Sequence, residues 1–220
     1  MQTLIVLGAS ARAAAFSIWR AGYQPYAIDL FADRDLAAIC PAVKIQRYPH
    51  DFLESLAAAP NAPWIYTGGL ENYPRLVDRL AEVRPLLGNP GDVLRPIRDP
   101  RQLAEAARDA GCVAPEMGGT AGSSSSADMQ WLVKPMRSSG GIAIRFATAT
   151  EQSRPPPGTY LQQIVEGASA SAVFIAASGR AGLLGMLGMR KIQKGTPPVP
   201  EQALAEAKKT SEALKANGHR

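Results

Sequence analysis

The sequence predicts an α/β fold followed by an α+β fold, and three observations lead to this expectation. Short continuous apolar runs alternate with helical segments over the first ninety or so residues, which is typical of a doubly wound parallel sheet. A turn-rich stretch over residues 87–100 then interrupts the alternation. Beyond it, strands follow one another with few helices between them, which indicates an antiparallel sheet. We therefore expect one domain over residues 1–92, a second over 93–189 and a tail over 190–220.

The first region begins with a strand and continues as alternating helices and strands. Leu4-Ile-Val-Leu has the length and composition of a strand covered on both faces, and Gly22 ends the helix that follows. Further strands are expected over residues 26–30, 43–48 and 64–67. Helices are expected over 13–21, 52–59 and 73–83, with a short helix or turn opening at 33–36.

The second region begins with a short helix over residues 101–110, which Gly111 closes. A strand over 131–134, a Ser/Gly loop and a strand over 142–146 together predict a hairpin. Later strands are expected over 160–165, 170–176 and 181–189, with a small-residue loop at 118–126 and a surface turn at 154–158.

Composition and charge exclude several classes of protein. The chain has 46% hydrophobic and 20% charged residues, and no apolar run is long enough to cross a membrane. Cys40 and Cys112 are isolated and there are only two histidines, so we expect no zinc site and a cytoplasmic protein with reduced thiols. The net charge is +5, but residues 190–220 carry +4 of it and five of the seven lysines. The excess therefore belongs to a basic, weakly ordered tail, and we expect no nucleic-acid partner.

The most informative stretch is Lys134-Pro-Met-Arg-Ser-Ser-Gly-Gly, which directly follows the apolar strand at 131–133. Lys134 is the only lysine between Lys44 and Lys191, although arginine is frequent. A strand-end ammonium beside glycine-rich backbone suits a nucleotide phosphate, because it can act together with bare N–H groups. The stretch is neither a Walker loop nor a dinucleotide fingerprint. A plain hairpin turn after a core strand explains the same residues equally well.

The N-terminal region offers further candidates for substrate contacts. Ser10 and Arg12 follow the first strand, where a helix N-terminus can hold an anion. The stretch 67–72 follows a later strand, although its glycines and Glu71-Asn72 are also explained as a turn and a helix cap. Asp29 ends the second strand, as a ribose-binding acid does, but no glycine fingerprint accompanies it.

Four motifs, taken in order, resemble the ATP-grasp superfamily, in particular the predicted ATP-dependent carboligases related to biotin carboxylase and tyramine–glutamate ligase. The motifs are Gly8-Ala-Ser-Ala-Arg-Ala with Asp29-Leu-Phe-Ala-Asp; Ala110-Gly-Cys-Val-Ala-Pro; Lys134-Pro with its Ser/Gly loop; and Leu161-Gln-Gln-Ile-Val-Glu-Gly followed by Ser171-Ala-Val-Phe. The resemblance covers about residues 1–188. It implies a Rossmann-like pre-ATP-grasp domain followed by an ATP-grasp domain that is incomplete at its C-terminal, metal-binding part.

The resemblance also implies roles for matched residues. Lys134 would contact ATP phosphates, and a mobile loop would close over them; its residues are Ser138, Ser139, Gly140 and Gly141. The adenine would meet a hinge segment, largely through backbone groups; its residues are Gln162, Gln163, Ile164 and Val165. The two glutamines are also explained as a strand edge. Where relatives carry an Asp-Lys pair, this chain has Asp99-Pro-Arg, so Arg98 or Arg101 would replace the lysine, or Pro100 simply starts a helix.

The activity implied by the resemblance is ATP-dependent ligation of a small carboxylate to an amine through an acyl phosphate, with cofactor biosynthesis among the implied roles. Mg²⁺ is implied too, but Glu201, Glu206 and Glu212 lie around a polar helix without a metal-binding pattern, so we assign no metal ligand. The alternative is a non-catalytic or truncated nucleotide-binding remnant, or a site that a partner chain completes. The expected partners are ATP and the two small substrates, with neither nucleic acid nor membrane. A homo-oligomer is left open.

Overall fold

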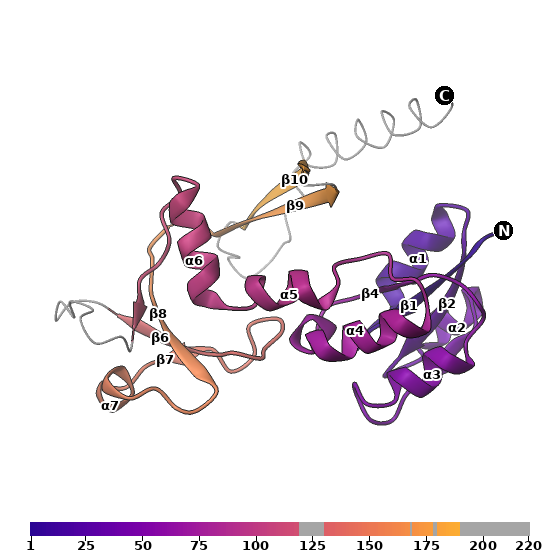
Figure 1. The fold of residues 1–220 in the computed structure, drawn as a ribbon, viewed down its shortest axis with the longest axis horizontal. Coiled ribbons are helices and arrows are strands. Elements are labelled where there is room, and N and C mark those ends of the chain that lie inside the picture. The colour runs from indigo at the N-terminus through magenta and orange to yellow at the C-terminus, as the bar shows by residue number, and fades with distance from the viewer. Residues whose placement is uncertain (119–129, 168, 178–179, 190–220) are drawn as a thin grey trace, which may run out of the picture. The chain divides into compact units, whose positions relative to one another are not determined.

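The computed structural model describes residues 1–118, 130–167, 169–177 and 180–189. The chain divides into two compact units, residues 1–164 and residues 165–220, and each is described by itself. The first unit holds a parallel sheet and an antiparallel sheet, and the second holds a hairpin (Figure 1). The domain boundary expected near residue 92 falls within the first unit and stays a prediction.

The parallel sheet has four strands in the order β3-β2-β1-β4. Their bounds are β1 Thr3–Leu7, β2 Gln24–Asp29, β3 Ala42–Lys44 and β4 Trp64–Tyr66. All three strand pairs are parallel, as the alternation of apolar runs and helices predicts. β3 is shorter than the expected strand at 43–48, because the Asp51 carboxylate accepts the N–H groups of Gln46 and Arg47 and turns the chain away.

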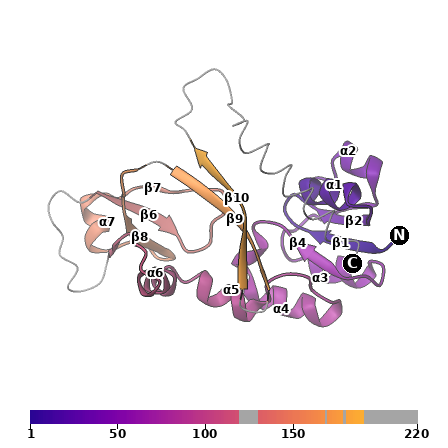
Figure 2. The same ribbon diagram turned by 90° about the horizontal axis from the view of Figure 1, so that it is seen from above.

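Helices cover both faces of this sheet (Figure 2). Their bounds are α1 Arg12–Arg20, α2 Arg34–Ile39, α3 Phe52–Ala58, the 3₁₀ helix η1 Leu70–Asn72 and α4 Pro74–Val83. Ile5 and Leu7 of β1 pack with α3 and α4, whereas Val6 between them packs with α1 and α2. Successive side chains of a strand point to opposite faces, so an unbroken apolar strand requires cover on both sides. The doubly wound arrangement is confirmed.

Two helices follow the parallel sheet, α5 (Gly91–Ile97) and α6 (Pro100–Asp109). α5 lies in the stretch expected to be turns, which is a correction. The Asp78 carboxylate of α4 accepts the Gly91 N–H at 2.8 Å and pairs with Arg95, and these contacts hold α5 in place despite its internal proline. α6 is the expected helix. Asp99 caps it and Pro100 takes the first helical position, where no N–H is needed.

The antiparallel sheet has four strands in the order β5-β8-β6-β7. Their bounds are β5 Met117–Gly118, β6 Trp131–Pro135, β7 Arg145–Phe146 and β8 Thr159–Gln163. The expected hairpin is present, since β6 pairs with β7, but residues 142–144 are not strand. Ala143 has a left-handed φ of 62°, which interrupts extended backbone. The short helix α7 (Ala149–Ser153) was not predicted, although Thr148 and Glu151 form a capping box at its start.

The second unit contains the antiparallel pair β9 (Ser169–Ala177) and β10 (Arg180–Met189), close to the two strands expected there. A register shift between Leu183 and Gly185 marks a bulge in β10. The expected basic tail, residues 190–220, and the expected small-residue loop lie outside the described residues, except for residue 118. Within the described part of the chain, no helix has the length and apolar character needed to cross a membrane.

Candidate functional site

Lys134 lies near the end of β6, on the face of the antiparallel sheet opposite its small core. It faces Tyr160 across the β6–β8 pair, and Leu132 faces Gln162, so these four side chains share one face. The Lys134 Nζ donates to Gln162 Oε1 at 2.9 Å and lies 5.8 Å from the centre of the Tyr160 ring. Among the described residues, no carboxylate pairs with Lys134. Its charge is therefore held by neutral groups and is available to an anion.

The Ser/Gly loop follows β6 and is closed by its own short contacts. Ser138 Oγ donates to the Ile142 carbonyl at 3.0 Å, and the Ile142 N–H donates to the Ser139 carbonyl at 3.3 Å. Gly140 and Gly141 have φ of +63° and +76°, a conformation that glycine adopts at no steric cost. Within the ranges that the structure covers, the N–H groups of residues 138–141 donate no hydrogen bond. Four consecutive bare N–H groups beside one ammonium suit a phosphate.

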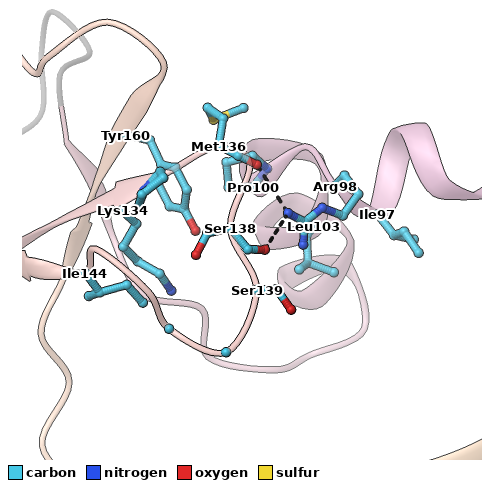
Figure 3. A pocket seen from close by; sticks show the side chains of 13 residues that line it. Ile97, Arg98, Pro100, Leu103, Lys134, Met136, Ser138, Ser139, Ile144 and Tyr160 are labelled. Atoms are coloured by element: carbon cyan, nitrogen blue, oxygen red, sulfur yellow. Dashed lines mark hydrogen bonds between the residues drawn. The ribbon is translucent and has the colours of Figure 1, made fainter. Parts of the chain in front are cut away.

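Lys134 and this loop line one cavity of about 230 Å³. Figure 3 shows the Lys134 side chain extending from β6 toward the loop, with Tyr160 beside it and Arg98 on the far side of the loop. Ile97, Leu103 and Ile144 supply apolar lining. Pockets that hold whole ligands usually measure about 300 Å³ or more, so the described lining suits the phosphate end of a nucleotide.

Arg98 and Asn72 fasten the loop to the parallel-sheet region. Arg98 Nη2 donates to Asn72 Oδ1, and to the carbonyls of Met136 at 3.2 Å and Ser138 at 3.4 Å. Asn72 Nδ2 donates to the same Ser138 carbonyl at 3.3 Å and to Gly69 O at 3.1 Å. Arg98 Nε is buried and has no partner among the described residues. Arg98 therefore positions the loop through Nη2, and it also lines the Lys134 cavity.

The hinge segment at residues 162–165 has most of its hydrogen-bonding groups engaged. The Gln163 N–H donates to Glu116 O at 2.9 Å, and the Gln163 side-chain oxygen accepts the Glu116 N–H at 3.1 Å. The Ile164 N–H donates to Gln130 O at 2.9 Å. The N–H of Val165 makes no hydrogen bond within the described residues. Of the predicted hinge, Gln162 meets Lys134, but none of residues 162–165 is among the described lining of the Lys134 cavity.

Other residues singled out in the sequence have structural partners. The buried Asp29 carboxylate accepts the N–H groups of Ala11, Phe31 and Ala32, which explains its place after β2 without a ribose. Arg12 pairs with Asp35 on the surface. Glu71 accepts the Gly69 N–H at 2.5 Å instead of capping α4.

Sequence reasoning missed two contributors to this site. Tyr160 was expected only as a strand residue, and its position opposite Lys134 follows from the strand register. Asn72 was noted as a turn or cap residue, and nothing in the sequence relates it to Ser138, 66 residues later.

The residues fit an anionic phosphate better than they fit a metal ion. Among the described residues, no group of three histidine, cysteine or acidic side chains could hold a metal. Lys134, Arg98 and the loop amides all favour negative charge instead. The described residues therefore do not form a binding site for Mg²⁺. Arg101, the other candidate for the missing lysine, lies in the first turn of α6, where its N–H donates to the capping Asp99.

Residues 97–197 match a family model described as an ATP-grasp domain. These residues belong to the ATP-grasp superfamily. The resemblance that the ordered motifs indicated is thus confirmed at the level of the superfamily. No curated protein sequence matches the chain.

Several solved structures have a similar fold. N5-carboxyaminoimidazole ribonucleotide synthetase from Thermus thermophilus aligns with a TM-score of 0.60 and 17% identity, over 96% of this chain and 64% of that one. An L-amino acid ligase from Bacillus licheniformis aligns with a TM-score of 0.62 and 15% identity, over 100% and 61%. A third structure is the biotin carboxylase domain of 2-oxoglutarate carboxylase from Hydrogenobacter thermophilus, solved with MgADP, ADP and bicarbonate. It aligns with a TM-score of 0.58 and 17% identity, over 96% of this chain and 58% of that one. The chain spans less than two thirds of each, and at these identities the likeness shows the fold.

Proposed function

We propose that this chain binds ATP at the Lys134 cavity and takes part in ATP-dependent ligation of a small carboxylate to an amine. The observation that carries the proposal is that Lys134, which pairs with no described carboxylate, lines one cavity with residues 138–141, whose N–H groups donate no hydrogen bond within the described residues. The superfamily match supports the same class of ligand and reaction. The acyl-phosphate route and a role in cofactor biosynthesis are parts of this proposal.

ATP would supply a γ-phosphoryl group to the carboxylate, which makes the acyl carbon open to attack by an amine. The protein's part is to hold and neutralise the phosphates. Lys134 would face the phosphate oxygens, and the amides of residues 138–141 would donate to them. Phosphoryl transfer depends on such positioning and charge stabilisation more than on covalent chemistry by the protein.

The ATP-binding part of the proposal is tested by calorimetric titration of the full chain with ATP and magnesium. Lys134→Ala removes the ammonium, and we expect ATP affinity to fall by about 10-fold or more, as loss of a hydrogen bond to a charged group commonly does. Lys44→Ala is the matched control, because Lys44 is an exposed lysine at the end of β3. Equal affinity in both variants would contradict the assignment.

Turnover separates the ligase from the non-catalytic alternative. ADP release on adding candidate acids and amines to the ATP-bound chain supports ligation. Tight ATP binding without ADP release under any acid and amine pair supports the non-catalytic nucleotide-binding reading.

A further inference from the structure

A second cavity, of about 340 Å³, adjoins the same Ser/Gly loop and is not needed for the phosphate site. Ser138 and Ser139 line both cavities. Its wall also includes Tyr48, the glycine turn before η1, Tyr73 next to α4, and Arg137 and Ile142 on either side of the two serines. Its volume lies within the range of small-molecule sites.

Among the described residues that line this cavity, Arg137 is the only charged one, and its guanidinium carbon lies 5.9 Å from the centre of the Tyr73 ring. Glu71 lies outside the lining, where it accepts the N–H of Gly69. None of the described residues that line it is acidic. Arg137 can therefore pair with one anionic group of a ligand, whereas an ammonium group on the same ligand would have no carboxylate partner among the lining residues.

The wall also contains apolar side chains against which the hydrophobic part of a ligand can pack. Tyr48, Tyr73 and Ile142 present apolar surface to the cavity, and Tyr48 packs edge-on against Tyr73 with ring centres 6.2 Å apart. Aromatic rings favour such edge-on and offset contacts with one another, so a planar or branched group suits the space.

The Tyr48 hydroxyl is a buried donor with no partner among the described residues. Burial, with smaller contributions from Tyr73 and Glu71, raises the pKa of Tyr48 to about 12, so the hydroxyl stays protonated. Gly69 makes room for it, since a Cβ at that residue would lie 2.6 Å from the hydroxyl oxygen. Buried polar groups usually have partners, and an acceptor on a ligand would supply this one.

We propose that the second cavity binds the carboxylate substrate, and that this substrate is a monocarboxylic acid with an aromatic or branched apolar body. Its carboxylate pairs with Arg137 and accepts the Tyr48 hydroxyl, and its body lies against the Tyr48 and Tyr73 rings and Ile142. Because Ser138 and Ser139 line both cavities, the acid lies next to the phosphate cavity. This assignment rests on the proposed ligase function, because it names that reaction's acid. It excludes dicarboxylates and α-amino acids as preferred substrates.

The test measures binding of four probes to the full chain by calorimetry, without ATP. The probes are 3-phenylpropanoate, its uncharged amide, succinate and phenylalanine. We expect 3-phenylpropanoate to bind most tightly, by about 10-fold over the amide, which lacks the charge that Arg137 recognises. A preference for succinate or phenylalanine, or equal binding of the amide, would overturn the assignment.

Two variants locate the binding. Arg137→Gln should lower the affinity for 3-phenylpropanoate by about 10-fold, and Tyr48→Phe should lower this affinity by a smaller factor without changing the ring packing. Arg154→Gln is the control, because Arg154 is an exposed arginine beyond α7 that lines none of the cavities described. Unchanged affinity in Arg137→Gln would place the acid elsewhere.

The outcome is separable from that of the ATP proposal. Lys134→Ala should weaken ATP binding by about 10-fold or more and leave 3-phenylpropanoate binding intact, since Lys134 does not line the second cavity. Acid binding without ATP binding would overturn the ligase proposal and keep this site as an acid-binding one. ATP binding without acid binding would overturn the substrate assignment alone.

Discussion

The two sheets of the first unit differ in the depth of the cores that support them. The parallel sheet is packed on both faces, with thirteen buried residues in one cluster and seven in the other. The antiparallel sheet has a cluster of three described residues, namely Trp131, Val133 and Leu161. Buried apolar area is the main source of stability. The Ser/Gly loop therefore follows a strand of the sheet with the smaller core, and Asn72 and Arg98 hold it against the region of the sheet with the larger core.

The largest expected effect comes from removing the main side chain of the small core. Trp131→Ala should cost about 3–5 kcal/mol, as large-to-small changes of buried aromatic residues commonly do. Since few other residues support this sheet, we expect the amides of β6 and β8 to lose protection from hydrogen exchange while those of β1 and β2 keep it. Trp19→Ala, at an exposed tryptophan, is the control. Equal loss of protection in both sheets would show that they unfold as one body.

A smaller effect is expected where the two sheets are joined. Asn72→Ala removes the side-chain nitrogen that donates to the Ser138 carbonyl and the side-chain oxygen that accepts from Arg98. Each such hydrogen bond contributes about 1 kcal/mol, so exchange of the hydrogen-bonded loop amides of Met136, Ile142 and Ile144 should speed up by about 30-fold. Asn89→Ala, at an exposed asparagine, should change nothing. If the loop amides exchange equally in both variants, the junction depends on other contacts.

The smallest effect concerns the edge of the antiparallel sheet. Arg145 donates to Glu151, and the Thr148 N–H and hydroxyl donate to it as well, which lowers the pKa of Glu151 to about 2. Because the folded state favours the ionised form, this contribution is present above the ordinary value of 4.5 and is lost as the pH falls toward 2. Amide chemical shifts of residues 149–153 should change over that interval. Glu151→Gln should remove the change, and an identical titration in that variant would contradict the assignment.

Prediction from sequence succeeded where a single residue pattern determines the local structure. The apolar run at residues 4–7 predicted a strand covered on both faces, and Asp99-Pro100 predicted a helix start. Prediction from sequence failed where contacts between residues that a local pattern does not relate determine the structure. α5 depends on Asp78 reaching Gly91, and β3 ends early because Asp51 holds Gln46 and Arg47.

The candidate site was likewise predictable only where a local motif contributes to it. Lys134 and the Ser/Gly loop were visible as a local motif. The pairing of Lys134 with Tyr160 requires the strand register, and the hold of Asn72 on Ser138 requires the folded chain. Tyr48 gave no signal at all, because a buried hydroxyl without a partner exists only in three dimensions.

Ser138 and Ser139 stand in the walls of both cavities, and this shared wall ties the occupancy of one to that of the other. Any ligand that shifts these serines alters the affinity of its neighbour, and thermodynamic reciprocity makes the factor identical in both directions. A loop drawn toward a phosphate would reshape the acid pocket, and a bound acid would tune the nucleotide affinity by the same factor. Coupling between ligands of the two cavities would thus pass through two adjacent serines.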